Sequence, residues 1–276
     1  MLNKQKEECP TLIPYMGGKF QLSKQFVPMI PPHDRYIEVF AGGLSMFFRK
    51  SKVEINILND KEKNLVNLYM CVAEKFNEFS EYVKWYLNSR EMFDIFKKQL
   101  KDKKPFDIPN PKRAARYYYC IRCSFNHNPL NPFGKVSSNW NRELINDLEL
   151  TRKKLDNTLF ENMDFKDLYN KYPVKKTDMW YLDPPYVVAT ERGDYYLEQF
   201  SQKDHEDLVE ICKDIDSKGA KFMVSYDDRK SVEESFKDFN IIKIPVIYSG
   251  QQHKRDYKNE LVIINYDPPN VQKSLF

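Results

Sequence analysis

Apolar residues occur along this chain both in short continuous runs and in helix-like periods, and the two patterns alternate. Short apolar runs predict strands, and amphipathic stretches predict helices. Strands are expected at residues 36–40, 54–58, 180–182, 221–225, 241–248 and 260–265. Helices are expected at residues 21–29, 44–49, 142–156 and 202–218. The alternation indicates an α/β fold whose sheet is mainly parallel.

One expected strand ends in the tetrapeptide Asp183-Pro184-Pro185-Tyr186. An ionised Asp183 only accepts hydrogen bonds, and the carbonyl of Pro184 is a second acceptor. Two fixed acceptors could hold both hydrogens of an amino group on a planar base, freeing the nitrogen lone pair for attack on an electrophilic methyl group. Tyr186 would offer a stacking face. The motif therefore favours methyl transfer onto an amino nitrogen, although Asp-Pro-Pro also closes ordinary turns.

The chain contains a second copy of this turn. Residues 266–270 read Tyr-Asp-Pro-Pro-Asn, also after an apolar run, but no helix follows them near the C-terminus. We interpret that copy as a terminal turn.

Two further segments indicate a nucleoside-containing ligand. The strand at 36–40 is broken by Gly42 and Gly43, and a helix follows. Such a turn lets the backbone approach a ligand at the carboxyl edge of a parallel sheet. The strand at 54–58 is followed by Asp60, an acidic residue suited to ribose hydroxyls. Upstream, residues 14–19 are glycine-rich, and Tyr15 could face a sulfonium cation with its ring.

Charge is concentrated in one part of the chain. Residues 97–142 carry eleven Lys and Arg against two acidic residues, a net +9, whereas the remainder carries −5. Aromatic residues, Asn and Ser are interleaved with these basic residues from 112 to 142, a composition suited to phosphate contacts and base reading. A second basic cluster lies in the predicted hairpin loop before residue 260.

The remaining composition excludes several classes of protein. Five scattered cysteines do not suggest a disulfide framework. Cys120 and Cys123 lack a second ligand pair, so we expect helix packing and no metal. No apolar run is long enough to cross a bilayer and no signal-like segment begins the chain, so we expect a cytoplasmic protein without membrane contact.

Taken in order, these motifs resemble the Dam-type DNA adenine-N6 methyltransferases, the alpha group of amino methyltransferases. The resemblance implies a Rossmann-like S-adenosylmethionine-dependent methyltransferase sheet with an inserted, mainly helical target-recognition domain. It also implies an adenine flipped out of double-stranded DNA. The catalytic residues it implies are Asp183, Pro184, Pro185 and Tyr186. The cofactor contacts it implies are Tyr15, Met16, Gly17, Gly18, Lys19, Glu38, Phe40, Gly42, Gly43, Asp60, Asp164, Phe165 and Asp183.

The predicted domains are a discontinuous catalytic domain, residues 1–65 and 150–276, and a DNA-binding insertion, residues 66–149. The candidate DNA-binding residues are Arg116, Arg122, Phe125, Asn126, Lys135, Asn139, Arg142, Lys254, Arg255 and Tyr257. The chain departs from the family at Leu44, where a further glycine is typical. It departs again after Asn126, where His127-Asn128-Pro129 replaces the family's glycine and arginine, so the family's GATC target is not transferred.

The sequence therefore predicts a site-specific DNA adenine-N6 methyltransferase with S-adenosylmethionine as cofactor. A companion restriction endonuclease is a candidate partner, and the sequence does not specify the oligomeric state. Two alternatives remain open at this point: an amino methyltransferase acting on RNA or on cytosine N4, and a catalytically inactive DNA-binding module of the same fold, suggested by Leu44.

Overall fold

The structure is a computed structural model that describes residues 9–15, 19–102, 104–129, 131–134, 140, 144–185, 200–247 and 257–269. Its strands are β1 (Arg35–Glu38), β2 (Ile55–Asn59), β3 (Thr158–Glu161), β4 (Asp178–Leu182), β5 (Lys221–Asp227), β6 (Asn240–Ile247) and β7 (Tyr257–Ile264). Its α-helices are α1 (Ser23–Phe26), α2 (Ser45–Arg49), α3 (Lys63–Glu74), α4 (Phe76–Trp85), α5 (Arg90–Lys101), α6 (Pro111–Cys123), α7 (Leu144–Leu155), α8 (Phe165–Lys171), α9 (Gln202–Ser217) and α10 (Lys230–Ser235). The described residues also form the 3-10 helices η1 (Val27–Met29) and η2 (Phe125–His127).

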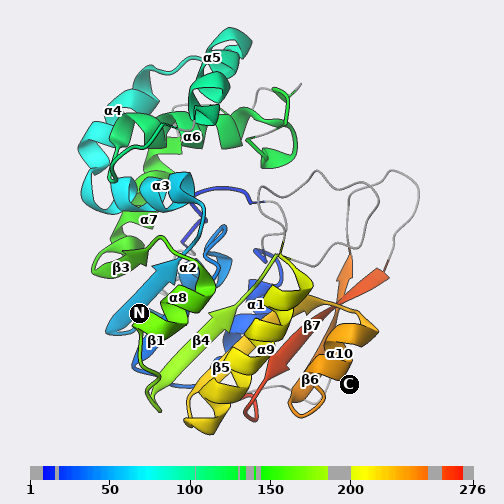
Figure 1. Ribbon diagram of the computed structural model, residues 1–276. Coiled ribbons are helices and arrows are strands. Elements are labelled where there is room, and N and C mark those ends of the chain that lie inside the picture. Colours follow the sequence, from blue (N-terminus) through cyan, green and yellow to red (C-terminus); the bar gives the residue numbers. More distant parts are fainter. Residues whose placement is uncertain are drawn as a thin grey trace, which may run out of the picture. The chain divides into compact units, whose positions relative to one another are not determined.

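The strands form one seven-stranded sheet in the order β3-β2-β1-β4-β5-β7-β6 (Figure 1). Strand β1 pairs in parallel with β2 and with β4, and β4 pairs in parallel with β5. Strand β7 is antiparallel to both β5 and β6. The predicted α/β class with a mainly parallel sheet is confirmed, and the expected strands lie within a few residues of the observed ones.

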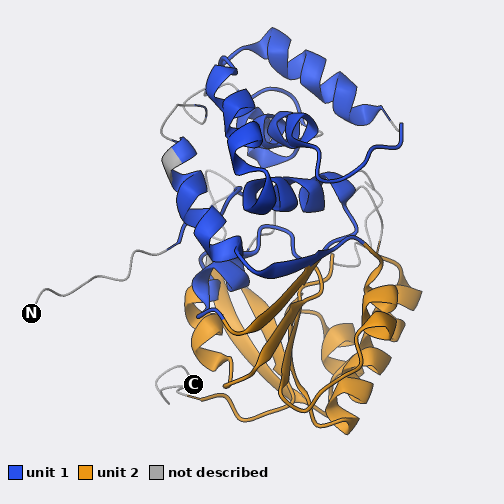
Figure 2. Cartoon of the chain, turned by 90° about the vertical axis from the view of Figure 1, so that its left-hand side faces the viewer, with its two compact units in different colours: residues 1–23, 41–52, 60–162 blue, residues 24–40, 53–59, 163–276 orange. Residues whose placement is uncertain are grey.

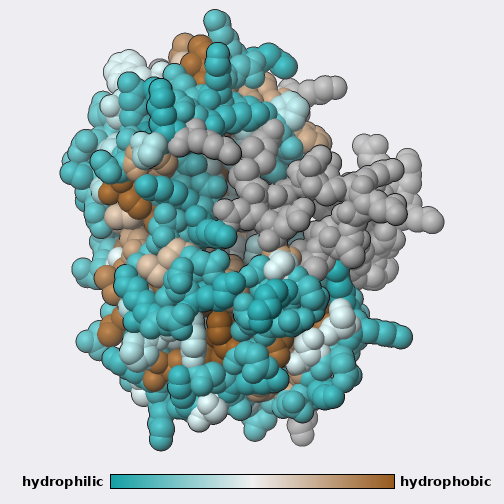
Figure 3. Space-filling view, in the orientation of Figure 1, coloured by the Kyte–Doolittle hydropathy of each residue, from teal (hydrophilic) through white to brown (hydrophobic). Residues whose placement is uncertain are grey.

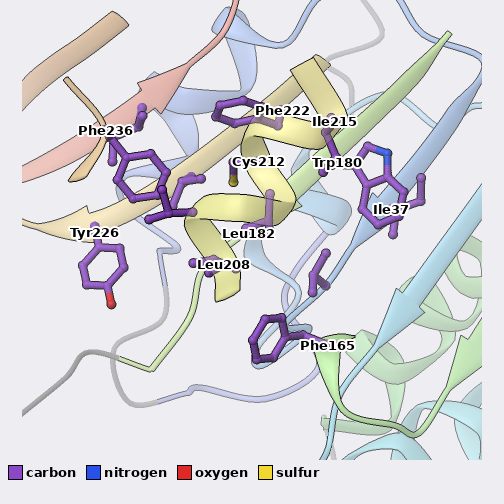
Figure 4. Packing of buried hydrophobic residues seen from close by; sticks show 14 of the residues in the cluster. Ile37, Phe165, Trp180, Leu182, Leu208, Cys212, Ile215, Phe222, Tyr226 and Phe236 are labelled. Atoms are coloured by element: carbon purple, nitrogen blue, oxygen red, sulfur yellow. The ribbon is translucent and has the colours of Figure 1, made fainter. Parts of the chain in front are cut away.

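One face of the sheet is covered by helices α8, α9 and α10. Helix α9 starts with a capping box, in which Ser201 and Asp204 exchange side-chain and backbone hydrogen bonds. Its buried residues Leu208, Cys212 and Ile215 recur at helical spacing and pack against residues of β1, β4 and β5 (Figure 4). Each buried aliphatic side chain contributes about 1.5–3 kcal/mol relative to exposure. The outer side of α9 is largely hydrophilic (Figure 3).

The chain divides into two compact units (Figure 2). Unit 1 comprises residues 1–23, 41–52 and 60–162, and unit 2 comprises residues 24–40, 53–59 and 163–276. Unit 2 contains six of the seven strands and the three covering helices. Unit 1 contains α2 to α7, and within it α6 contacts α3, α4 and α5. No helix in the described part of the chain is long and apolar enough to span a membrane.

The core of unit 1 is rich in aromatic residues. Helix α6 begins with Asn110 as its N-cap and Pro111 in its first turn, which is a favourable start for a helix. Cys120 and Cys123 of α6 are buried with Tyr119, Phe93 and Phe96. Burial raises the pKa of the Cys123 thiol to about 12, so it packs as a neutral group.

A buried ion pair joins the first residues of the two central strands. Arg35 of β1 donates two hydrogen bonds to the carboxylate of Asp178 in β4, at 2.8 and 2.6 Å, and a third to the carbonyl of Pro173. Asp178 also accepts a hydrogen bond from the backbone of Lys175. This pair lies at the amino ends of β1 and β4, so it fixes their register at the end opposite Asp183.

Removing one partner of this pair should destabilise the fold strongly. We expect Asp178→Ala to lower the free energy of unfolding by about 3–5 kcal/mol, because the Arg35 charge stays buried without its counter-ion. Glu210→Ala, which removes an exposed pair with Lys213, is the control and should stay within about 0.5 kcal/mol of the parent. Urea unfolding measures both, and equal effects would contradict a structural role for the buried pair.

Candidate active site

Asp183 lies at the point of unit 2 where the strand order of the sheet reverses. Strands β1 and β4 are parallel neighbours, with Glu38 opposite Tyr181. The pairing extends past β1, since the backbone N–H of Val39 donates to the carbonyl of Tyr181 at 3.0 Å. Asp183 therefore leaves β4 beside the residues that leave β1. Open α/β sheets bind ligands at such switch points, outside the carboxyl ends of the strands.

The first residues of the motif are partly or fully shielded from solvent. Pro184 is buried, while Asp183 and Pro185 are partly buried. Tyr186 lies outside the described residues. The other Asp-Pro-Pro turn, at residues 267–269, follows the antiparallel strand β7, and its Asp267 is exposed. The two copies thus have different environments.

The Asp183 carboxylate is held by a hydroxyl from the neighbouring strand. Ser225 of β5 donates to Asp183 Oδ1 at 2.8 Å, and the Tyr181 hydroxyl lies 2.9 Å from Ser225 Oγ. Burial, followed by the nearby Asp183 charge, raises the pKa of Tyr181. Sequence reasoning did not select Ser225 as a site residue. Its place at the end of an expected strand is a signal that could have indicated it.

Glu38 of β1 is also a buried acid. It is 2% exposed and accepts a hydrogen bond from the Tyr36 hydroxyl at 2.8 Å. Burial, followed by the adjacent Glu38 charge, raises the pKa of Tyr36 and keeps that hydroxyl a donor.

Aromatic rings gather after β1 and at the start of α8. The ring centroids of Phe40 and Phe165 are 5.5 Å apart, and Phe200 lies 6.0 Å from Phe40 and 5.7 Å from Phe165. Asp164 is the N-cap of α8, since its side chain accepts from the backbone N–H of Lys166. The structure therefore brings together three of the expected cofactor residues, Phe40, Asp164 and Phe165, and adds Phe200.

A buried amide ties these segments together. Asn59, at the end of β2, donates to the carbonyls of Val39 and Met163 and accepts from the Met163 backbone N–H. It is 1% exposed. Sequence reasoning chose its neighbour Asp60 and missed Asn59, because its partners are distant in the sequence.

In unit 1, the turn with the two glycines is closed by an aromatic ring. A Cβ on Gly42 would lie 3.2 Å from the ring of Tyr15, and one on Gly43 would lie 2.8 Å from the Tyr15 Cβ. Gly42 also has a φ of +45°, and its carbonyl accepts a hydrogen bond from the buried hydroxyl of Tyr69 at 2.5 Å. Contact with Tyr15 thus excludes a side chain at residue 43, and the positive φ favours glycine at residue 42. Sequence reasoning did not select Tyr69.

Asp60 binds the same turn. One carboxylate oxygen accepts from the backbone N–H of Gly42 and the other from that of Glu62, both at 2.9 Å. Burial nevertheless raises the pKa of Asp60 to about 6, against the opposing effect of these two hydrogen bonds.

Leu44 occupies a left-handed backbone conformation, with φ 53° and ψ 33°. Its N–H donates to the carbonyl of Ala41, and its side chain is fully buried. A leucine therefore adopts the conformation that glycine adopts most easily. The departure from the family pattern leaves the described turn intact.

Lys19, another expected cofactor contact, is buried in the same unit. Met16, Gly17 and Gly18 lie outside the described residues.

The expected DNA-binding residues near α6 differ in exposure. Arg116 packs its guanidinium 5.5 Å from the centre of the Phe96 ring, and Arg122 is partly buried. Phe125 and Asn126 are exposed in η2, where Asn126 has a φ of 53°.

A network of hydrogen bonds closes this loop. The Phe125 N–H donates to the carbonyl of Pro132, and the Asn131 side chain donates to the carbonyl of Phe125.

Among the other expected DNA-binding residues, Tyr257 is the first residue of β7. Lys135, Asn139, Arg142, Lys254 and Arg255 lie outside the described residues.

A mainly parallel sheet with an acidic turn at its switch point defines the class of open α/β proteins, whose ligands bind at the carboxyl ends of the strands. A family model described as D12 class N6 adenine-specific DNA methyltransferase matches residues 15–249. The chain therefore belongs to the family of D12 class N6 adenine-specific DNA methyltransferases.

Individual relatives agree with this family. The chain is 28% identical over 283 residues to the type II methyltransferase M1.LlaDCHI of Lactococcus lactis subsp. cremoris, covering 96% of this chain and 99% of that protein. It is 24% identical over 288 residues to the DNA adenine methylase of Haemophilus influenzae, covering 95% of each. It is 26% identical over 277 residues to the type II methyltransferase M.FokI of Planomicrobium okeanokoites, where it covers 91% of this chain and 42% of that protein.

The match to this family confirms two predictions made from the sequence, namely the resemblance to DNA adenine-N6 methyltransferases and the enzyme class. The activity of the family is methylation of adenine N6 in DNA, which implies a DNA substrate and a methyl donor. RNA and cytosine N4, the alternative substrates left open by the sequence, are not those of this family.

Leu44 provides a test of the glycine turn. We expect Leu44→Ala to lower the free energy of unfolding by about 2–5 kcal/mol, because it empties a buried site and keeps the strained Cβ. Leu44→Gly should cost about 1 kcal/mol less, because glycine adopts this conformation without strain. Thermal or urea unfolding compares them. A glycine variant less stable than the alanine variant would contradict the left-handed conformation of residue 44.

Proposed function

We propose that this chain transfers a methyl group from S-adenosylmethionine to N6 of an adenine flipped out of duplex DNA, with Asp183 as the central catalytic residue. The observation that supports it is the position of Asp183 at the β1–β4 switch point, oriented by Ser225. A carboxylate there is an acceptor for an amino hydrogen, and the Pro184 carbonyl supplies a second acceptor.

The chemistry follows from those two acceptors. The lone pair of an adenine amino group is delocalised into the ring, which makes the nitrogen a poor nucleophile. Hydrogen bonds from both amino hydrogens to Asp183 and Pro184 favour a pyramidal nitrogen and disperse the positive charge that develops on it. The prolines fix φ, so the acceptors are placed before the base arrives, and Tyr186 stacks on the base.

The donor S-adenosylmethionine supplies an electrophilic methyl group on a sulfonium. The residues of this chain fit such a group: Gly42 and Gly43 leave their turn without side chains, and Asp60 presents a carboxylate next to it. Phe40 and Phe165 offer apolar ring faces suited to an adenine. As its contacts we propose Tyr15, Met16, Gly17, Gly18, Lys19, Glu38, Phe40, Gly42, Gly43, Asp60, Asp164, Phe165 and Asp183.

For DNA recognition we propose the insertion of residues 66–149, which contains the basic residues of 97–142, with a contribution from the loop before β7. The exposed pair Phe125 and Asn126, displayed in a hydrogen-bonded loop, supports this assignment. The proposed DNA contacts are Arg116, Arg122, Phe125, Asn126, Lys135, Asn139, Arg142, Lys254, Arg255 and Tyr257. A DNA substrate also supports a cytoplasmic location, and relatives named type II methyltransferases support a companion restriction endonuclease.

Replacing Asp183 tests the catalytic assignment. We expect Asp183→Ala to lower the single-turnover rate of methyl transfer about 100- to 1,000-fold, because one of the two charge-stabilising acceptors is lost. Transfer of a labelled methyl group from S-adenosylmethionine to adenine-containing duplexes measures the rate. Asp267→Ala, in the second Asp-Pro-Pro turn, is the matched control and should match the parent. An active Asp183→Ala variant would refute the role of Asp183.

The pKa of Asp60 predicts how cofactor affinity depends on pH. With a pKa of about 6, Asp60 is ionised above this pH and protonated below it. Ribose hydroxyls donate better to the charged form, so affinity should be constant above pH 7 and fall as the pH drops through 6, by about tenfold per unit. Calorimetry with S-adenosylhomocysteine between pH 5 and 8 measures this dependence.

The control for this experiment is Asp60→Asn, which has no carboxylate to titrate. We expect weaker binding at neutral pH and no slope between pH 5 and 7. The same slope in both proteins would show that another group titrates, and the assignment of Asp60 to the ribose would then be wrong.

A further inference from the structure

Three hydroxyl and carboxyl groups form a directional chain of hydrogen bonds inside unit 2. Ser225 Oγ donates to Asp183 Oδ1 at 2.8 Å, and the Tyr181 hydroxyl lies 2.9 Å from Ser225 Oγ. A serine hydroxyl has one proton, and Ser225 gives it to Asp183. Tyr181 must therefore be the donor to Ser225. The chain runs from Tyr181 through Ser225 to Asp183.

The surroundings fix this direction. Ser225 is fully buried and Tyr181 is 2% exposed, so water does not compete for either hydroxyl. Burial and the neighbouring acidic groups raise the pKa of Tyr181, so its hydroxyl keeps its proton. A phenol that stays protonated has the proton that Ser225 Oγ can accept.

Two of the three residues belong to paired strands of the sheet. Tyr181 is in β4, and Ser225 is in the adjacent parallel strand β5, where Leu182 lies opposite Val224. Ser225 is held on its other side by antiparallel pairing with Val262 of β7. Its hydroxyl position is thus set by two strand neighbours, whereas Asp183 belongs to the turn after β4.

We propose that Ser225 is a positioning residue that fixes the orientation of the Asp183 carboxylate, with Tyr181 keeping the Ser225 proton directed at Asp183. Ser225 does not touch the substrate in this proposal. Its effect is on the rate of methyl transfer, because alignment of the acceptor with the amino hydrogen governs how much charge it stabilises. The inference rests on the catalytic role proposed above for Asp183.

Single-turnover methyl transfer with S-adenosylmethionine and duplex DNA tests this proposal. We expect Ser225→Ala to lower the rate about 10- to 100-fold, the range for loss of a hydrogen bond to a charged group. The dissociation constants for S-adenosylhomocysteine and DNA should change less than about threefold, since neither ligand contacts Ser225. Ser225→Thr keeps the donor and should recover most of the rate. Ser217→Ala, which removes an exposed hydroxyl on α9, is the control.

Two further variants separate positioning from stability. Tyr181→Phe leaves the bond from Ser225 to Asp183 in place and should have a smaller effect than Ser225→Ala. The double variant Tyr181→Phe with Ser225→Ala removes both hydroxyls of this hydrogen-bond chain, so neither is left buried without a partner. It should therefore fold even where Ser225→Ala is unstable. It should be as slow as Ser225→Ala.

The failure of this inference differs from the failure of the proposed function. If Asp183→Ala is inactive but the folded double variant transfers methyl groups at the parent rate, the positioning role is wrong and the catalytic assignment stands. If Asp183→Ala is fully active, the catalytic assignment itself is wrong. A Ser225→Ala effect that persists undiminished in the Asp183→Ala background would also overturn the inference, because the two residues would then act independently.

Discussion

The parallel pairing of β1 with β4 is the constraint on which the rest of unit 2 depends. It places two strands that are distant in the sequence side by side, with the Arg35–Asp178 pair at their amino ends and Asp183 beyond their carboxyl ends. Because the strand order reverses here, Val39 and Asp183 leave neighbouring strands of unit 2 at the same edge of the sheet. A motif that is only a turn in isolation thereby becomes a candidate site. The same tripeptide after the antiparallel strand β7 has an exposed aspartate and no such setting.

Much of this architecture could be predicted from local patterns. Each of three short segments predicted an element close to the observed one, because its pattern is contained in a few consecutive residues. These segments are the apolar run at residues 36–40, the glycines at 42 and 43, and the apolar residues before Asp183. The ordered motifs then indicated the family, because their combination is far more specific than any single one. The alternation of patterns typical of strands and of helices likewise predicted the α/β class.

Other features could not be predicted, because they depend on strand order or on backbone geometry. The bond from Ser225 to Asp183 requires β5 to lie next to β4, and the bonds of Asn59 require the ends of β1 and β2 to meet the segment at Met163. Leu44 departs from the family's glycine pattern, yet it takes the left-handed conformation and remains buried. No propensity favours a leucine there. Burial of its side chain offsets that strain.

The central claim is that a carboxylate at this switch point directs a methyl group to adenine N6. Its most direct test is nucleoside analysis by mass spectrometry of duplex DNA after incubation with the protein and S-adenosylmethionine. The account predicts N6-methyladenine as the methylated nucleoside. N4-methylcytosine in its place, or methylation of RNA with none of DNA, would contradict it.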